Sequence, residues 1–280
     1  MNLTRDLGKF AGLLRQRRFR RGSSRNPVEA FPRFFDTWNK GKHSWPIDVA
    51  FDPQKTLLTV SDQGENGETV HIARNLRTSL YRGGVEKRLK FLWSEYLADE
   101  VPITPGDVVL DVGANVGEFS MVARKAGARV FACEPDPIEY RALVENIGPE
   151  CAFNLALWRE SGSMTFYSKN DTGDSSLLEM ADYSEKVEVQ TLTLDQFHSD
   201  KMGGSEIRLI KLEAEGAEPE IIEGGTSALR KTRFVSVDAG PERGMKQENT
   251  IVEVLSALQD LGFRLTRFGN HRHVMLLERG

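Results

Sequence analysis

The chain has 280 residues, a formal net charge of −4 and an ordinary apolar share of 39%. We therefore expect either one large α/β domain with an accessory segment or two small domains. Two cysteines, Cys133 and Cys151, exclude a disulfide framework and lack the spacing of a zinc site. No apolar run approaches the roughly 20 residues of a spanning helix, and the first residues lack the apolar core of a cleavable signal, so we expect a cytoplasmic protein.

The basic residues are concentrated at the N-terminus. Residues 1–25 carry eight Lys or Arg against one Asp, which leaves 29 against 40 acidic residues in the remainder. Leu3, Leu7 and Leu14 fall at helical spacing. Such a segment fits peripheral contact with the anionic inner surface of a membrane. We favour the alternatives, a solvated terminus or a helix that packs on a second subunit.

Residues 26–100 are predicted to form a small α+β subdomain. Within it, 56–61 and 69–73 read as two strands, joined by a tight turn in which Asn66 and Gly67 adopt positive φ values. A helical stripe of apolar residues follows the hairpin. This subdomain also offers a surface for a homodimer.

Residues 101–280 are predicted to form the main domain, because apolar strands here alternate with helical stretches. That pattern indicates a largely parallel Rossmann-like α/β sheet with helices on both faces. The expected strands are 108–112, 129–134, 151–157, 207–213 and 234–238. The runs "SMTFYS" and "KVEVQTLTL" predict an inserted antiparallel ribbon, and "FRLTRF" and "HRHVMLLER" predict a final hairpin.

The first of these strands leads into the sequence "DVGANVG". Gly113 and Gly117 can turn tightly without a Cβ that would block a cofactor, and the amides of the next helix point into the crevice. The spacing matches neither the NAD fingerprint nor a P-loop. Asp111 would repel a pyrophosphate but attract the ammonium and sulfonium groups of S-adenosylmethionine.

A second acid, Glu134, ends the next strand about 20 residues after the glycines, where an acid can accept hydrogen bonds from both ribose hydroxyls. Pro135 then stops the strand. Taken singly, a glycine turn or an acid at a strand end can be purely structural. Two acids and two glycines at these intervals predict S-adenosylmethionine as the cofactor.

The chain is similar to class I S-adenosylmethionine-dependent methyltransferases and, more narrowly, resembles the FkbM family. The motifs that carry the resemblance are, in order, "LDVGANVGEFS", "ACEPDP", "NLALWRESGSMTFY", "GDSSLLE", "VQTLTLDQF", "IKLEAEGAEPEIIEGG" and "VSVDAGPERG". The resemblance implies a seven-stranded sheet with an antiparallel last strand. It also implies O-methylation of a hydroxyl on a sugar, a glycolipid or a secondary metabolite.

Several residues match the family's methyl-donor site. They are Asp111, Gly113, Ala114, Asn115 and Gly117 in the loop, Glu134 and Pro135 beside the ribose, and Ala156 and Leu157 near the adenine. For Ala156 and Leu157, plain core packing is an equally open alternative. We expect no bound metal.

The acceptor hydroxyl must lose its proton during an in-line methyl transfer. Glu213, Glu215 and Asp238 are the candidate catalytic carboxylates, because they lie at or just after the ends of the fourth and fifth strands. Family members commonly have Asp where Glu213 stands, so its carboxylate reaches further here. The acids near Glu213 can also bind a divalent cation or favour an amine acceptor, and we assign Glu218 to capping the next helix.

Three further residues are candidates for contact with the acceptor. Arg243 can grip a carboxylate or phosphate, or else pair with Asp238. Ser175 and Ser176 lie in a polar loop that can reach the methyl donor or the acceptor, or form a simple turn.

We expect a small-molecule or glycosyl acceptor and no nucleic-acid partner, because the body of the chain is acidic and lacks an Asn-Pro-Pro-Tyr type motif. Two alternatives stay open. One is a nucleic-acid methyltransferase that uses the N-terminal arginines on phosphates. The other is a catalytically idle module that retains donor binding.

Overall fold

The computed structural model describes residues 27–40, 44–169, 175–180, 183–270 and 272–280. The chain divides into two compact units after Arg88, and each is described by itself. The predicted basic segment 1–25 lies outside the described residues, and the predicted domain boundaries stay predictions. Within the described ranges, no helix has both the length and the apolar character needed to cross a membrane.

The first unit contains a three-stranded antiparallel sheet. Its elements are α3 (Pro27–Trp38), β1 (Ile47–Asp52), β2 (Leu57–Asp62), β3 (Thr69–Ile72) and the 3₁₀ helix η2 (Asn75–Tyr81). The predicted hairpin is confirmed as β2 and β3, which pair antiparallel. Its turn differs in detail, since positive φ occurs at Gly64 (112°) and Asn66 (64°) and not at Gly67.

The second unit is built on a seven-stranded sheet with the order β14-β15-β11-β10-β4-β5-β6. The bounds are β4 (Val108–Val112), β5 (Arg129–Cys133), β6 (Ala152–Phe153), β10 (Ile207–Leu212), β11 (Thr232–Asp238), β14 (Phe263–Phe268) and β15 (Val274–Arg279). β15 pairs antiparallel with both of its neighbours, whereas the pairs from β11 across to β6 are all parallel. The predicted Rossmann-like methyltransferase sheet with an antiparallel last strand is thus confirmed.

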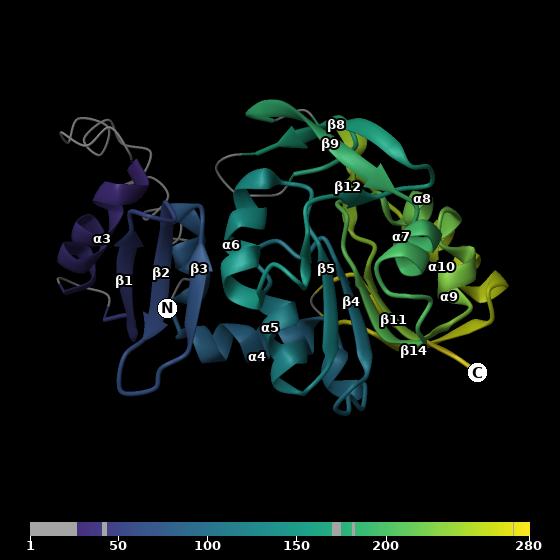
Figure 1. Ribbon diagram of the computed structural model, residues 1–280, viewed down its shortest axis with the longest axis horizontal. Coiled ribbons are helices and arrows are strands. Elements are labelled where there is room, and N and C mark those ends of the chain that lie inside the picture. Colours follow the sequence, from purple (N-terminus) through teal and green to yellow (C-terminus); the bar gives the residue numbers. More distant parts are fainter. Residues whose placement is uncertain (1–26, 41–43, 170–174, 181–182, 271) are drawn as a thin grey trace. The chain divides into compact units, whose positions relative to one another are not determined.

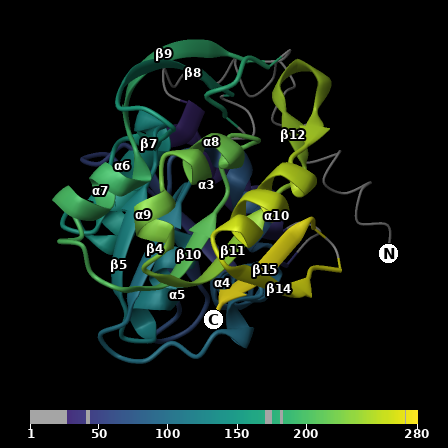
Figure 2. The ribbon, with the colours of Figure 1, turned by 90° about the vertical axis from the view of Figure 1, so that its right-hand side faces the viewer.

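Helices cover both faces of this sheet (Figures 1 and 2). On one face lie α5 (Glu118–Lys125) and α6 (Pro137–Ile147), and on the other α7 (Leu194–Asp200), α8 (Glu218–Glu223), α9 (Thr226–Leu229) and α10 (Ile251–Asp260). Leu110 and Val112 of β4 join the core that contains α7 to α10, while Val109 joins the core that contains Phe119 of α5. Because side chains alternate along a strand, Asp111 lies on the α5 side.

The predicted third strand, 151–157, is split in the structure. After β6 the chain leaves the large sheet, and the Asn154 side-chain amide donates to the carbonyls of Glu134 (2.8 Å) and Pro135 (3.1 Å) at this point. It resumes as β7 (Ala156–Leu157), which pairs with β9 (Glu185–Leu192). β9 also pairs antiparallel with β8 (Gly162–Ser168), and this confirms the predicted ribbon.

Short elements complete the unit. Helix α4 (Val85–Glu95) runs across the division between the units and is followed by the 3₁₀ helix η3 (Ala98–Glu100). After β11 come β12 (Pro241–Arg243), the 3₁₀ helix η4 (Gly244–Lys246) and β13 (Glu248–Asn249). β12 and β13 pair antiparallel beside the carboxyl end of β11.

Candidate active site

The glycine break between β4 and α5 is a tight turn in which three residues have positive φ values. These are 70° at Gly113, 53° at Asn115 and 88° at Gly117. A Cβ at Gly113 would collide with the carbonyl oxygen of Glu213, and one at Gly117 would lie 2.6 Å from Leu143 Cδ1. Glycine is therefore required at Gly113 by the close approach of two strand ends as well as by its φ angle.

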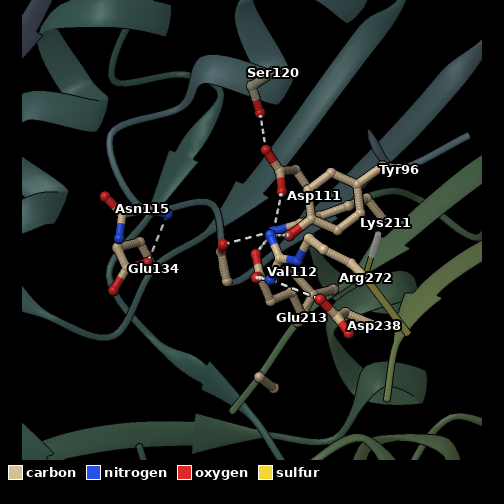
Figure 3. A network of polar contacts seen from close by, with 12 residues as sticks. Tyr96, Asp111, Val112, Asn115, Ser120, Glu134, Lys211, Glu213, Asp238 and Arg272 are labelled. Carbon is tan, nitrogen blue, oxygen red and sulfur yellow. Dashed lines mark hydrogen bonds and ion pairs between the residues drawn. The ribbon is translucent and has the colours of Figure 1, made fainter. Parts of the chain in front are cut away.

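Glu134 fastens this loop to the end of β5. Its Oε2 accepts a hydrogen bond from the Asn115 amide (2.7 Å), and its Oε1 accepts one from the Asp136 amide (2.8 Å). We call Glu134, Asn115 and Asp136 the Glu134 clamp, and Figure 3 shows the bond between Glu134 and Asn115. Burial raises the pKa of Glu134 to about 8, although both backbone hydrogen bonds act in the opposite direction. Once ionised, the carboxylate has about four lone-pair sites, so each oxygen can accept one further hydroxyl, and such hydrogen bonds favour the ionised form.

Asp111, the other predicted acid of the methyl-donor site, is fully buried. Its Oδ2 accepts a hydrogen bond from Ser120 Oγ at 2.7 Å, and its Oδ1 lies 3.3 Å from Lys211 Nζ. Lys211 is the register partner of Asp111 on β10. The charge of Asp111 is thus balanced inside the protein by a lysine that the sequence interpretation did not include.

Lys211 ties the ends of β4 and β10 together. Its ammonium group donates to the carbonyls of Val112 (3.1 Å) and Gly113 (2.7 Å) and lies 3.2 Å from Glu213 Oε2. The side chain is only 3% exposed. Burial lowers the pKa of Lys211, but the carboxylates of Asp111 and Glu213 outweigh burial and raise it. The lysine therefore stays charged and holds the glycine loop through its carbonyls.

Two of the predicted catalytic carboxylates, Glu213 and Asp238, meet at Arg272. The guanidinium lies 2.5 Å from Glu213 Oε1 and 2.6 Å from Asp238 Oδ2, and it donates to the Tyr96 hydroxyl at 3.3 Å. Figure 3 shows these side chains converging from the ends of neighbouring strands. We call Asp111, Lys211, Glu213, Asp238 and Arg272 the Lys211 cluster.

Cations control the titration of Glu213. Burial on its own raises its pKa, but Lys211 and Arg272 outweigh burial and lower it to about 2. For Asp238, burial is the largest influence and the pKa is raised, although Arg272 acts against this. Glu213 is therefore a firmly ionised anchor for two cations.

Glu215 and Glu218 follow in the turn that leads from β10 into α8. Glu215 has a positive φ of 51°. The buried Glu218 carboxylate accepts hydrogen bonds from the amides of Ala214 (2.8 Å) and Gly216 (3.2 Å). Glu218 thus orders the turn before α8, and its carboxylate also interacts with its own backbone amide at the start of the helix.

Ser175 makes a local hydrogen bond in the structure, whereas Ser176 makes a long-range one. Ser175 Oγ accepts from the Lys169 amide at 2.9 Å, and Ser176 Oγ donates to the carbonyl of Glu215 at 3.1 Å. Ser176 is buried and forms a bridge with Tyr167 of β8. Ser176 thereby joins the β8–β9 ribbon to the turn after β10, and the proposed acceptor contacts of both serines stay predictions.

Arg243 binds Glu220 and not Asp238. Its guanidinium donates to Glu220 Oε2 at 2.9 Å and to Oε1 at 2.5 Å, and it also donates to the carbonyl of Gly216. The alternative pairing of Arg243 with Asp238 is therefore wrong, because Asp238 pairs with Arg272. Contact of Arg243 with the acceptor stays a prediction.

The remaining predicted residues of the methyl-donor site lie in the glycine break and in β7, and a contact of Ala156 and Leu157 with the adenine stays a prediction. The amides of Gly113 and Ala114 both donate to the carbonyl of Cys133 at 3.0 Å. Ala156 and Leu157 are buried in β7, and their side chains pack in the core. Across the described ranges, no group of three or more His, Cys, Asp or Glu is placed to hold a metal ion.

Tyr96, Ser120, Lys211 and Arg272 belong to this site but were missed by the sequence analysis. Lys211 carries a usable sequence signal, because it is a cation within the otherwise apolar run "LIKL". Arg272 lies in the final hairpin, far in sequence from Glu213 and Asp238, and has no comparable signal.

Comparison with known proteins places this chain in a family. Residues 111–265 match the methyltransferase FkbM domain. The 2-O-methyltransferase NoeI of Sinorhizobium fredii is 29% identical over 47% of this chain and 62% of its own length. The 31-O-demethyl-FK506 methyltransferase FkbM of Streptomyces tacrolimicus is 27% identical over 57% of this chain and 73% of its own length.

A third relative is the hexuronic acid methyltransferase AglP of Haloferax volcanii, which is 29% identical over 47% of this chain and 55% of its own length. The matches thus span between about half and three quarters of the relatives' lengths. More than half of the present chain lies within the family match. The chain therefore belongs to the methyltransferase FkbM domain family, which confirms the prediction of an S-adenosylmethionine-dependent methyltransferase domain.

Proposed function

We propose that this protein transfers a methyl group from S-adenosylmethionine to a hydroxyl of a small-molecule or glycosyl acceptor. The observation that carries the proposal is the glycine break between β4 and α5 together with the Glu134 clamp. The names of the three relatives support the acceptor class, because they describe a 2-O-methyltransferase, a 31-O-demethyl-FK506 methyltransferase and a hexuronic acid methyltransferase.

The residues of the glycine break fit the proposed methyl donor. A Cβ at Gly113 would fill the space where the loop approaches Glu213, and Glu134 keeps acceptor capacity for hydroxyl groups beyond its two amides. The bound donor supplies a methyl group on a positively charged sulfur. The sulfur is the leaving group and takes the electron pair of the carbon–sulfur bond. Asp111 and Lys211 act indirectly, by fixing the loop that holds it.

The acceptor is proposed to lie over the ends of β10 and β11. Glu213 with its pKa of about 2 is a weak base, so its role here is to hold Arg272 and Lys211 in place. Catalytic roles for Asp238 and Glu215 stay predictions. Membrane contact through residues 1–25, a cytoplasmic location and a homodimer also stay predictions.

The proposal is tested by incubating the full chain with methyl-labelled S-adenosylmethionine. The acceptors are methyl glycosides of hexoses and hexuronic acids, and a cell extract. We expect a labelled product in mass spectrometry whose label survives mild alkali, because methyl ethers resist hydrolysis and methyl esters do not. Gly113→Ala is the matched inactive control, since its Cβ blocks the loop geometry.

Two results would contradict the proposal. Label that is released by nuclease treatment of the extract would favour the nucleic-acid alternative. Tight binding of the methyl donor without any labelled product would favour the catalytically idle module.

A further inference from the structure

Five carboxylates approach the proposed acceptor end of the sheet, and four of them are already engaged. Glu213 is ion-paired with Lys211 and Arg272. Asp238 is paired with Arg272 and accepts a hydrogen bond from the Gly240 amide at 3.2 Å. Glu218 accepts backbone amides, and Glu215 also has an interaction partner within the chain.

The fifth carboxylate belongs to Glu242, which lies on β12 directly after β11. A Cβ placed on Gly240 would be 3.3 Å from Asp238 Oδ1 and 3.5 Å from Glu242 Oε1. The two carboxylates therefore approach each other at Gly240. Among the described residues, no hydrogen bond or ion pair engages the Glu242 side chain, so its lone pairs are available to a bound molecule.

The surroundings of Glu242 make it a much stronger base than Glu213. Asp238 of β11, Glu213 after β10 and Glu218 of α8 all face it with negative charge, and Arg272 before β15 faces it with positive charge. Burial, followed by Asp238 and Glu213, raises the pKa of Glu242 to about 8. Arg272 offsets only part of this, because it is shared between Glu213 and Asp238.

We propose that Glu242 is the general base of the methyl transfer, a role that rests on the proposed function. The acceptor O–H bond breaks and its proton moves to a Glu242 carboxylate oxygen. The electron pair of that bond stays on the acceptor oxygen, which forms the new bond to the methyl carbon. The bond between that carbon and sulfur breaks, and its electron pair goes to sulfur.

This assignment divides the work between two groups of acids. Glu213 remains ionised and, with the other residues of the Lys211 cluster, holds the strand ends, while Glu242 is the carboxylate that exchanges a proton. A positive charge at this edge of the sheet favours the ionised form of Glu242. Binding of cationic S-adenosylmethionine therefore releases a proton from Glu242 near neutral pH, and binding of its uncharged-sulfur product S-adenosylhomocysteine releases fewer.

The proton release gives a test that needs no acceptor. Calorimetry of both nucleosides in phosphate and in Tris buffer, which differ in ionisation heat, counts the protons released. We expect the wild-type chain to release more protons with S-adenosylmethionine than with S-adenosylhomocysteine, and Glu242→Gln to remove this difference. An unchanged difference in Glu242→Gln would overturn the inference.

Turnover gives the second readout, with the labelled methyl donor and the same methyl glycosides and extract. We expect Glu242→Gln to lower kcat by about 10²- to 10⁴-fold while the Kd for S-adenosylhomocysteine changes by less than about threefold. The wild-type kcat/KM should rise with pH up to about 8, following the pKa of Glu242 in the free chain, whereas kcat should reach its plateau at a lower pH because the bound methyl donor favours the ionised form. Glu248→Gln is the matched control, because Glu248 is exposed on the neighbouring strand β13.

The outcomes separate this inference from the proposed function. A wild-type chain that binds no methyl donor or transfers no label refutes the proposed function, and the inference falls with it. A wild-type chain that transfers label while Glu242→Gln keeps a similar kcat overturns the inference alone. If Glu242→Gln does not fold, Glu242→Asp replaces it in the test. This change moves the carboxylate back by one methylene, so the inference predicts a lower kcat. An unchanged kcat in Glu242→Asp would contradict the inference.

Discussion

Glu134 and Glu213 follow β5 and β10, the two strands that flank β4 in the sheet, yet their pKa values are shifted in opposite directions. Glu134 follows β5 and is met by two backbone amides, and its pKa is raised to about 8. Glu213 follows β10 and is met by Lys211 and Arg272, and its pKa is lowered to about 2. Both carboxylates are largely buried, so the difference comes from their partners.

The contrast suggests different uses for the Glu134 clamp and the Lys211 cluster. Backbone dipoles hold a carboxylate in place but compensate its buried charge only in part, so Glu134 gains from further hydrogen-bond donors. Full cations compensate Glu213 so well that it has little left to offer a ligand. The Glu134 clamp is therefore suited to binding hydroxyls, and the Lys211 cluster to holding the strand ends in register.

The largest effect is expected for Lys211→Met. This change leaves Asp111 buried without its cation and takes one of two cations from Glu213. Breaking a buried pair in this way costs about 3–5 kcal/mol, measured as the free energy of unfolding in urea. Arg208→Met on the same strand is the control, since its ion pair with Asp107 (3.9 Å) is partly exposed and contributes about 0–1 kcal/mol. Equal, small losses in both variants would contradict the role of Lys211.

Glu134→Gln tests the clamp through the pH dependence of stability. The folded-state pKa of Glu134 is raised from 4.5 to about 8, so the folded chain binds a proton that the unfolded chain releases in this window. Wild-type stability therefore falls as pH rises from about 4.5 to about 8, by on the order of 4 kcal/mol from this group. Glu134→Gln should remove this fall in stability with pH. The lost hydrogen-bond acceptor changes the stability of the variant by the same amount at every pH and leaves the slope unaffected. A variant with the wild-type slope in urea unfolding would show that Glu134 is not the titrating group.

Glu213→Gln should show the opposite dependence on the acid side. The folded-state pKa of Glu213 is lowered from 4.5 to about 2, so its stabilisation is complete above about pH 4.5 and is lost as pH falls toward 2. The gap between wild type and Glu213→Gln should be about 3 kcal/mol at neutral pH and should shrink in acid. Urea unfolding at a series of pH values checks this, and a gap that stays constant would argue against cation control.

A smaller effect is expected for Ser120→Ala. It removes the 2.7 Å hydrogen bond to Asp111 but leaves the contact with Lys211. A hydrogen bond to a charged group contributes about 1.5–3 kcal/mol, so we expect a loss near the lower end in urea unfolding. Thr104→Ala is a matched control, because its hydroxyl bond to Asp107 (2.9 Å) is exposed. A Ser120→Ala loss no larger than the control would mean that Lys211 alone satisfies Asp111.

The sheet and the glycine break could be predicted from sequence because both follow from local patterns. Buried strands between helical stretches indicate a parallel sheet, and glycines between β4 and α5 indicate a tight turn. The split of the third strand could not be predicted, because its first part pairs with β5 and its second part with β9, and these partners are set by the tertiary fold and not by a local pattern.

The sequence indicates the acids of the site but not the residues that pair with them. Neither the pairing of Asp238 with Arg272 nor that of Arg243 with Glu220 follows from sequence spacing. Lys211 stands out in the sequence as a cation in an apolar strand, but its pairing with Asp111 required the register of β4 and β10. Because partners set the titration of each carboxylate, the division between Glu213, Asp238 and Glu242 required the structure.

Calorimetric titration of S-adenosylhomocysteine into the wild type, Gly113→Ala and Gly106→Ala tests the methyl-donor site most directly. Both glycines have positive φ, but a Cβ at Gly113 would collide with Glu213, whereas a Cβ at Gly106 would meet nothing within 4 Å. We predict binding to the wild type and to Gly106→Ala, and its loss in Gly113→Ala. Absence of binding to the wild type, or equal binding to all three proteins, would contradict the assignment of the glycine break as the methyl-donor site.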